Sequence, residues 1–296
     1  MNPKVSVIIP TYNRPHLIGR AIKSVLNQTY QDFEIIIIDG SPNNETEKVI
    51  QPYLTDSRIH YFHEPDVHTN TVKDRANIAK ARNKAVRMAK GEYIAPLDDD
   101  DFWCNQKKLE KQVKFLENNS DYALCGGGVI GIYKENLGKS FTITILYPER
   151  NEDVRKIMLA PEGLIHSTVV FRKDDWKSVD GYDEKHSLSE EWDLHLKLGK
   201  IGKFYNFQEY FTAYVEGEHV KQHIIKYRRK CILSGIRLNI KYWRDYPDFH
   251  KYCFYLLVSY FYSFLPVFLR KLLFPMRSKI KISFRKSFGV SERKIS

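Results

Sequence analysis

The chain has 296 residues, of which 43% are hydrophobic and 28% charged, so it is long and apolar enough to bury a core and is not a mostly disordered chain. Its four cysteines are widely spaced without a CxxC pair, which argues against a zinc ribbon, a thioredoxin-type site and a disulfide-dense scaffold. The net charge of +11 is uneven, because residues 216–296 carry 18 Lys and Arg against 5 Asp and Glu, whereas the first 215 residues are close to neutral.

The first hundred residues alternate between short apolar runs and segments with helical spacing. Residues 5–9 and 34–39 are β-branched runs, typical of strands buried on both faces. The same patterns predict further strands over residues 59–62 and 93–97, and helices over residues 16–27, 45–54 and 77–90. This alternation predicts a parallel α/β sheet covered by helices, with ligands beyond the carboxyl ends of its strands.

Further elements are predicted after residue 106. The patterns indicate helices over residues 107–118 and 190–200, and strands over residues 122–133, 141–145 and 166–172. Beyond about residue 217 the composition becomes basic and aromatic. We therefore divide the chain into an α/β domain over residues 1–216 and a helical C-terminal region over residues 217–296.

Four consecutive aspartates follow the fourth predicted strand, at residues 98–101. Adjacent carboxylates repel one another and need a cation or ample water. Mg²⁺ and Mn²⁺ are commonly held by one or two carboxylates together with substrate phosphates. The run therefore indicates a metal site for a diphosphate, and the alternative is a solvated acidic turn.

Four segments carry a family resemblance: VSVIIPTYNR at residues 5–14, EIIIIDGSPNNET at 34–46, KGEYIAPLDDDDFW at 90–103 and SEEWDLHLKL at 189–198. In this order they resemble family-2 glycosyltransferases of the GT-A fold, over roughly residues 3–215. The resemblance implies a Rossmann-like, mostly parallel sheet flanked by helices. It also implies a nucleotide-sugar donor, a divalent metal ion and an inverting transfer.

The resemblance assigns roles to residues at the ends of the predicted strands. Three residues of the first loop would line the nucleotide pocket: Pro10, Thr11 and Asn13. Asp39 would hydrogen-bond the base, although Gly40 stands where many members have a second aspartate, and Arg82 would approach the nucleotide. Their ordinary alternatives are turn formers at the first loop, a helix N-cap at Asp39 and a solvated helix residue at Arg82.

Within the aspartate run, the resemblance implies a DxD motif. Asp98 would lie near the ribose and Asp100 would bind Mn²⁺ or Mg²⁺, with Asp99 in the variable middle position of this nucleotide-sugar site.

The family's catalytic base corresponds to Glu191, where an aspartate is usual. A general base must reach hydrogen-bond distance of the acceptor hydroxyl, and the extra methylene of Glu places its carboxylate further from the backbone. Glu190 is the main rival. Without the resemblance, both would pass for surface carboxylates at a helix N-terminus, and Asp193 would be structural.

The ten histidines include no clear zinc-ligand spacing. His219, which follows the predicted catalytic domain, is either an additional metal ligand or a surface residue. His166 and His195 are expected to be packed or to face the acceptor.

The C-terminal region contains an uncharged stretch over residues 252–269, followed by Arg270 and Lys271. As a helix, 18 residues would span about 27 Å, just short of the hydrocarbon core. The aromatic content and the basic flanks favour a helix at an anionic membrane surface over a full span, a dimer contact or a core helix. The basic groups could also bind nucleic acid, but the 18-residue uncharged apolar stretch argues against this partner.

The sequence thus predicts a cytoplasmic, metal-dependent, inverting glycosyltransferase, peripheral at the inner face of the cell membrane. The expected partners are a nucleotide-sugar donor and a saccharide or lipid-linked acceptor in cell-surface polysaccharide synthesis. A sugar-phosphate nucleotidyltransferase and a catalytically silent membrane-bound scaffold of the same fold remain as alternatives. The sugar, the nucleotide and the oligomeric state stay open.

Overall fold

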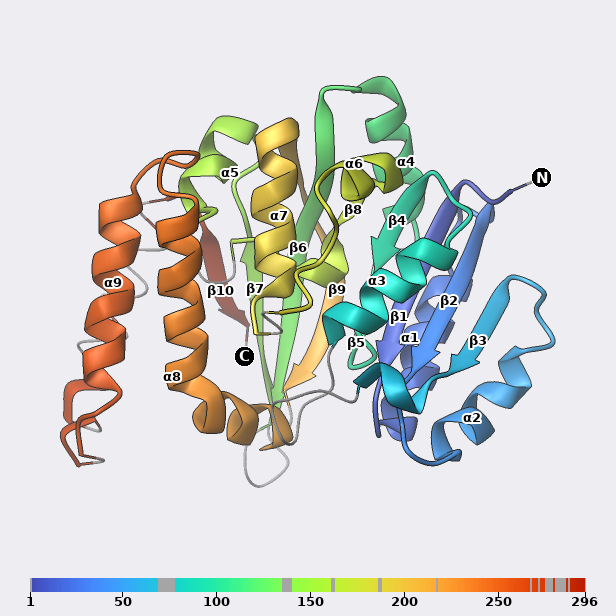
Figure 1. Cartoon of the computed structure of the whole chain (residues 1–296), viewed down its shortest axis with the longest axis horizontal. Helices are drawn as coiled ribbons and strands as arrows, with labels where there is room; N and C mark the ends of the chain where they lie inside the picture. Colours follow the sequence, from blue (N-terminus) through green and yellow to red (C-terminus); the bar gives the residue numbers. More distant parts are fainter. Residues whose placement is uncertain are drawn as a thin grey trace.

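The computed structural model (Figure 1) describes residues 2–68, 78–134, 140–160, 163–185, 188–216, 218–266, 268–270, 272–274, 279, 286 and 288–295. The side chains of residues 68, 134 and 216–228 are outside this description.

The N-terminal half is the predicted parallel sheet. Its strands are β1 (Val5–Thr11), β2 (Phe33–Asp39), β3 (Ile59–His63) and β4 (Tyr93–Pro96), with β1 between β2 and β4. The helices between them are α1 (Pro15–Leu26), α2 (Glu45–Ile50) and α3 (Ile78–Met88). Every residue of β1 and β2 is buried, as their β-branched runs predict. The helix predicted over residues 45–54 ends at Ile50 and continues as a 3₁₀ turn.

The second half of the sheet is mixed. It contains β6 (Tyr122–Lys134), β7 (Ser140–Leu146), β8 (Val170–Arg172) and β9 (Lys203–Glu216). With the C-terminal strand β10 (Ser291–Ile295), the order along the sheet is β10-β7-β6-β8-β4-β1-β2-β3, and the short β5 (Asp101–Trp103) pairs with β9. Antiparallel pairing of β8 with both β4 and β6 joins the two halves.

Two predictions for this half differ from the structure. The strand predicted over residues 166–172 is wrong in its first part, because His166–Thr168 forms a 3₁₀ turn and only Val170–Arg172 pairs. The 14-residue strand β9 was not predicted, although its dense aromatic content is typical of strands.

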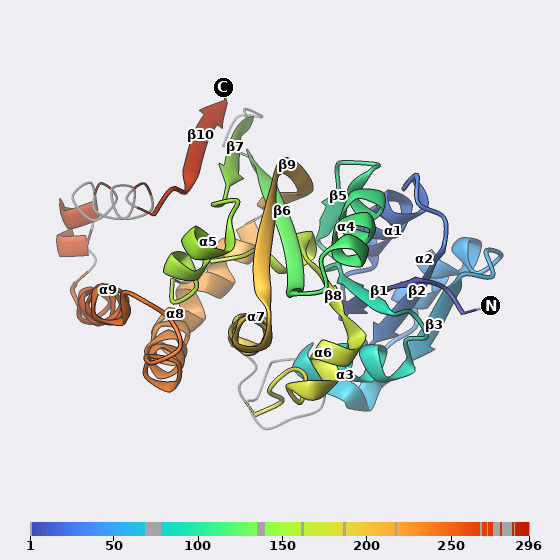
Figure 2. The same ribbon diagram turned by 90° about the horizontal axis from the view of Figure 1, so that it is seen from above.

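Helices cover both faces of the sheet (Figure 2), with α3, α6 (Lys173–Ser178) and α7 (Glu190–Ile201) on one side and α1 and α4 (Lys108–Asn118) on the other. Because side chains alternate between the two faces along a strand, β1 contributes to the apolar cluster on each face. Ile8 packs with residues of α3, α6 and α7, whereas Val5, Val7 and Ile9 pack with residues of α1 and α4. The helix α5 (Asn151–Ile157) lies beside β9.

The C-terminal region packs onto this core. Helices α8 (Glu218–Lys241) and α9 (Phe249–Tyr262) lie side by side at one end of the molecule (Figure 1). Leu238 and Tyr242 share a cluster with Leu194 and Leu198 of α7. The strand β10 (Ser291–Ile295) pairs with β7. The division at residue 216 therefore stays an interpretation of composition, and the residues on both sides contribute to one core.

The uncharged stretch over residues 252–269 is not one continuous helix. Helix α9 ends at Tyr262, and turns follow before Pro266. Within the described part of the chain, no helix combines the length and the apolar character required for a membrane span.

Candidate donor and catalytic site

The aspartate run lies at the carboxyl end of the parallel sheet, next to the end of β1. Thr11, the last residue of β1, donates a hydrogen bond of 2.7 Å from Oγ1 to Oδ2 of Asp99. Arg14 Nη1 donates to Asp99 Oδ1 at 2.9 Å and to Asp100 Oδ2 at 2.8 Å. The structure therefore brings the first loop and the aspartates together, as the sheet topology predicts.

The aspartates are crowded and largely enclosed. Burial raises the pKa of Asp99 to about 7; Arg14 opposes this shift and the neighbouring Asp100 adds to it. Burial and the negative charge of Asp98 likewise raise the pKa of Asp100, against the effect of Arg14. Both shifts arise first from burial of the carboxyl groups, which disfavours their charged form, and Arg14 is the cation that offsets it.

Arg82 connects the aspartates to the predicted base. Its side chain is 1% exposed, and Nη2 donates to Asp98 Oδ1 at 2.6 Å. Nη1 lies 3.0 Å from Glu190 Oε1 and 3.4 Å from Glu191 Oε2. Arg82 is thus not the solvated helix residue of the alternative interpretation, because it holds three carboxylates from two separate parts of the chain.

Glu190 and Glu191 begin helix α7 but differ in exposure. The Glu190 side chain is 7% exposed and makes the shorter contact with Arg82, whereas 42% of the Glu191 side chain is exposed. Desolvation by the surrounding protein raises the pKa of Glu191 to about 7, with Arg82 opposing the shift and Asp98 and Glu190 adding to it. Of the two glutamates, Glu191 has the more exposed side chain, which suits a general base that must reach an acceptor hydroxyl.

A buried layer of aromatic and histidine side chains supports Arg82. His166 Nδ1 lies 3.1 Å from His195 Nε2, and His166 Nε2 lies 3.0 Å from the Tyr182 hydroxyl. Burial and the charge of Arg82 lower the pKa of His195 to about 3 and lower that of His166 as well, so both rings are neutral. The expectation that these histidines are packed is confirmed.

The predicted base-binding residue Asp39 is fully buried. Its Oδ1 accepts hydrogen bonds from the backbone N–H and the hydroxyl of Ser41, and its Oδ2 accepts one from Tyr61 at 2.8 Å. Asn13 has a positive φ of 54°, and its N–H donates to Ser41 Oγ. Asp39 therefore fixes the position of Ser41, which in turn holds the first loop through Asn13. The contact of Asp39 with a nucleotide base stays a prediction.

Pro10 lies within strand β1, where it pairs with Ile38, and not in the loop that follows. The loop itself begins after Thr11.

Ser167 is a buried residue that the sequence analysis assigned to a strand. Its Oγ accepts a hydrogen bond from the N–H of Asp98, and its carbonyl accepts from Trp103 Nε1 and Thr212 Oγ1. Ser167 therefore fixes the backbone where the aspartate run begins. No sequence signal pointed to it, because this contact joins residues 69 positions apart.

A divalent ion would find hard oxygen ligands here, but few of them. Among the described residues, no group of three or more His, Cys, Asp or Glu side chains is arranged to hold a metal. Asp100, with 33% of its side chain exposed, offers a partly exposed carboxylate. This fits an ion held by one carboxylate and substrate phosphates. The His219 side chain lies outside the described side chains.

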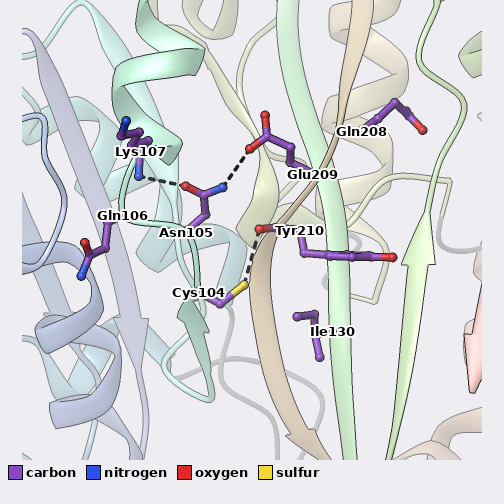
Figure 3. Close-up of a pocket in the computed structure, with 8 residues that line it drawn as sticks. All are labelled: Cys104, Asn105, Gln106, Lys107, Ile130, Gln208, Glu209 and Tyr210. Carbon is purple, nitrogen blue, oxygen red and sulfur yellow. Dashed lines mark hydrogen bonds between the residues drawn. The ribbon is translucent and has the colours of Figure 1, made fainter. Parts of the chain in front are cut away.

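A separate cavity of about 680 Å³ lies beside residues 104–107, which directly follow β5 (Figure 3). It is lined by Cys104, Asn105, Gln106, Lys107, Ile130, Gln208, Glu209 and Tyr210. Asn105 crosses it to donate to Glu209 at 3.1 Å. None of the predicted donor, metal or base residues lines this cavity, so it is separate from the candidate site.

Comparison with known proteins gives a consistent result. The family model described as glycosyl transferase family 2 matches residues 6–177. The chain is 31% identical over 292 residues to an uncharacterized glycosyltransferase of Methanocaldococcus jannaschii, with 94% of each chain covered. It is also 27% identical over 266 residues to the hyaluronan synthase of Pasteurella multocida, covering 85% of this chain but only 26% of the synthase.

Among solved structures, the mannosyltransferase from Pyrobaculum calidifontis in complex with GDP-Man and Mn²⁺ has a similar fold. The TM-score is 0.62 at 16% identity, and the match covers 97% of this chain and 82% of that one.

Proposed function

The chain belongs to glycosyl transferase family 2 and is a nucleotide-sugar-dependent glycosyltransferase with a GT-A-like fold, and from this premise we propose a metal-assisted, inverting transfer to a hydroxyl of a saccharide or lipid-linked acceptor. The observation that carries the proposal is the position of Arg82, which holds Asp98 of the predicted donor site and the Glu190–Glu191 pair within one hydrogen-bonded group.

In the proposed reaction, an acceptor hydroxyl attacks the anomeric carbon of the donor. A new C–O bond forms as the bond from that carbon to the diphosphate oxygen breaks, and the configuration inverts. Glu191 accepts the hydroxyl proton, and the nucleoside diphosphate leaves with the electron pair. Arg82 stays hydrogen-bonded to Asp98 and Glu190, which keeps the base and the donor site in register.

Asp100 would hold the divalent ion, Mn²⁺ or Mg²⁺, together with the donor phosphates. When bound, such an ion neutralises charge that develops on the leaving diphosphate. Release of nucleoside diphosphate from a panel of UDP-, GDP- and dTDP-sugars tests the activity. Loss of release in EDTA and in Asp100→Ala would support metal dependence, whereas full wild-type activity in excess EDTA would refute it.

The same assay separates the alternatives. A catalytically silent scaffold would bind a nucleotide-sugar without releasing nucleoside diphosphate. A nucleotidyltransferase would form a nucleotide-sugar from a sugar phosphate and release pyrophosphate. The family match and the synthase relative favour transfer of a sugar into a polysaccharide.

We further propose that the enzyme acts as a peripheral protein at the inner, anionic face of the cell membrane. Helix α9 supports this, because apolar residues occur on both of its sides. Tyr252, Leu256 and Ser259 are buried against the molecule. The opposite side exposes four apolar side chains, Phe254, Leu257, Val258 and Phe261, with Phe254 and Phe261 each more than two-thirds exposed. Exposed apolar patches of this kind mark interaction sites.

Basic groups border this apolar side. Lys251 precedes it, and the Arg229 guanidinium lies 4.0 Å from the ring centroid of Phe264. Aromatic burial and Lys or Arg attraction to anionic lipid would act together, the latter at about 1 kcal/mol for each basic residue near the surface.

Sedimentation with vesicles that contain phosphatidylglycerol tests the membrane proposal. The wild type should sediment with them, and the double variant Phe254→Ser, Phe261→Ser should remain mostly in the supernatant. High salt should release only part of the wild type, because salt screens charge but not apolar burial. Wild-type protein that ignores anionic vesicles would refute the proposal.

A further inference from the structure

Two arginines pair with carboxylates of the aspartate run, and they differ in how firmly they are held. Arg82 is 1% exposed and bonds to three carboxylates, whereas the Arg14 side chain is 46% exposed and bonds to Asp99 and Asp100. Arg14 therefore has room to leave its partners, and Arg82 does not.

The local backbone directs Arg14 onto the aspartates. The preceding residue, Asn13, adopts a left-handed conformation that non-glycine residues seldom take, and its N–H is held by Ser41. Arg14 then forms the N-cap position of α1 and points its Nη1 between the two carboxylates. On the same helix, Arg20 donates to the carbonyl of Asp100 at 2.6 Å and fixes the backbone of this residue independently of Arg14.

Asp100 Oδ2, which is 2.8 Å from Arg14 Nη1, belongs to the carboxylate that the proposed function gives to the metal ion. A guanidinium and a divalent cation repel each other and cannot share this oxygen edge at hydrogen-bond distance. The diphosphate of a donor offers Arg14 a new anionic partner, since guanidinium groups bind phosphate oxygens well.

We propose that Arg14 takes the cation position at Asp99 and Asp100 in the donor-free enzyme, and that the donor diphosphate draws Arg14 away and so opens Asp100 to the divalent ion. This inference rests on the proposed metal-dependent function and adds a binding order to it. Mn²⁺ binds weakly to the free enzyme and tightly once the nucleotide is present. Arg14 acts as a positioning residue that keeps the carboxylates charge-compensated between turnovers.

Mn²⁺ binding to the full-length protein, followed by electron paramagnetic resonance with and without GDP or UDP, tests the inference independently of activity. In the wild type, the nucleotide should tighten Mn²⁺ binding by about tenfold or more. The reason is that Arg14 occupies the site in most donor-free molecules, and the apparent Mn²⁺ affinity is reduced in proportion to the fraction of molecules in which the site is free. Without nucleotide, Arg14→Gln should bind Mn²⁺ about tenfold more tightly than the wild type. Arg14→Lys, which keeps the charge but cannot bridge both carboxylates in the same way, should fall between them.

Lys23→Gln is the matched control, because it removes one positive charge from an exposed position of the same helix. It should bind Mn²⁺ like the wild type. Thermal unfolding of each variant verifies that it is folded. Equal Mn²⁺ affinity of the wild type and Arg14→Gln without nucleotide would overturn the inference and leave the proposed function intact. Absence of Mn²⁺ binding in every protein, even with nucleotide, would overturn both the inference and the metal-dependent mechanism.

Discussion

Arg82 Nη2 donates a hydrogen bond of 2.6 Å to Asp98 Oδ1, and this contact ties helix α3 to the segment that follows strand β4. The other terminal nitrogen of the same guanidinium faces Glu190 and Glu191 at the start of helix α7. One buried cation thus sets the distance between the predicted donor carboxylates and the predicted base. Because the guanidinium is planar and rigid, it transmits the position of one group to the other.

Replacing this cation should be costly. Arg82→Met removes the cation that lies 3.0 Å from the buried Glu190 carboxylate and 2.6 Å from Asp98, so we expect a loss of about 3–5 kcal/mol in the free energy of unfolding. Urea denaturation measures this loss. The control is Arg87→Met on the same helix, where the side chain is 57% exposed and the change should stay within about 0.5 kcal/mol. Equal effects of the two variants would contradict the central position of Arg82.

The two glutamates should separate by kinetics. Glu191→Gln keeps the size of the side chain but cannot accept a proton, so turnover should fall by about 10²-fold or more while nucleotide affinity is kept. Glu190→Gln should mainly reduce stability, because Glu190 is the buried partner of Arg82. Steady-state kinetics and calorimetric titration of the nucleotide check this. The reverse pattern would move the base to Glu190, and normal turnover in both variants would exclude the pair.

The raised pKa of Glu191 predicts a pH dependence. A base must be deprotonated to act, so kcat/KM should rise as the pH increases through about 7 and level off above it. A folded-state pKa above the unfolded value also means that this carboxyl contributes stability below its unfolded pKa, near 4.3, which is lost as the pH rises through about 7.

The control for this pH effect is Glu191→Gln. Thermal unfolding of this variant should show a smaller decline than the wild type over the same pH interval. An unchanged pH profile of the residual activity in Glu191→Gln would show that another group titrates.

Helix α8 offers a test of whether the C-terminal region belongs to the catalytic core. Leu238 is 2% exposed and packs in the cluster with α7, whereas Leu233 on the same helix is 47% exposed. Leu238→Ala should cost about 2–5 kcal/mol in the free energy of unfolding. Leu233→Ala should cost well under half of that, because little apolar area is lost from the interior. Similar small effects at both positions would indicate that α8 is only loosely attached.

This packing changes an expectation about truncation. From the sequence alone, a chain that ends near residues 215–217 is expected to be soluble and to retain donor binding, because the predicted donor and metal residues all precede its end. In the structure, Tyr242 donates to Asp193 of α7 at 2.9 Å, and Lys241 donates to the same oxygen at 2.7 Å. A truncated chain would leave this buried carboxylate without both partners, so we expect it to aggregate or to unfold at a lower temperature.

Local patterns were sufficient for the N-terminal half of the fold. The β-branched runs that form β1 and β2 and the apolar spacing of α1 and α3 lie within short windows, so their period reveals the element. The aspartates at residues 98–101 and the glutamates before α7 were likewise visible as motifs. The aromatic content of β9 is a local strand signal that a sequence analysis can use, whereas the turn at His166–Thr168 cannot be predicted this way, because tertiary contacts override the local strand preference there.

By itself, the sequence determined the family and the order of strands and helices along the N-terminal half. It also determined which residue types lie at the carboxyl ends of the parallel strands. All of these depend on patterns along the chain. Only the tertiary structure decided that Arg82 is buried between Asp98 and Glu190, that Arg14 occupies Asp99 and Asp100, and that Asp39 is enclosed by Ser41 and Tyr61. The physical reason is that burial and charge pairing depend on groups far apart in the chain. Whether a carboxylate is solvated, paired or open to a ligand is set by what the folded chain places beside it.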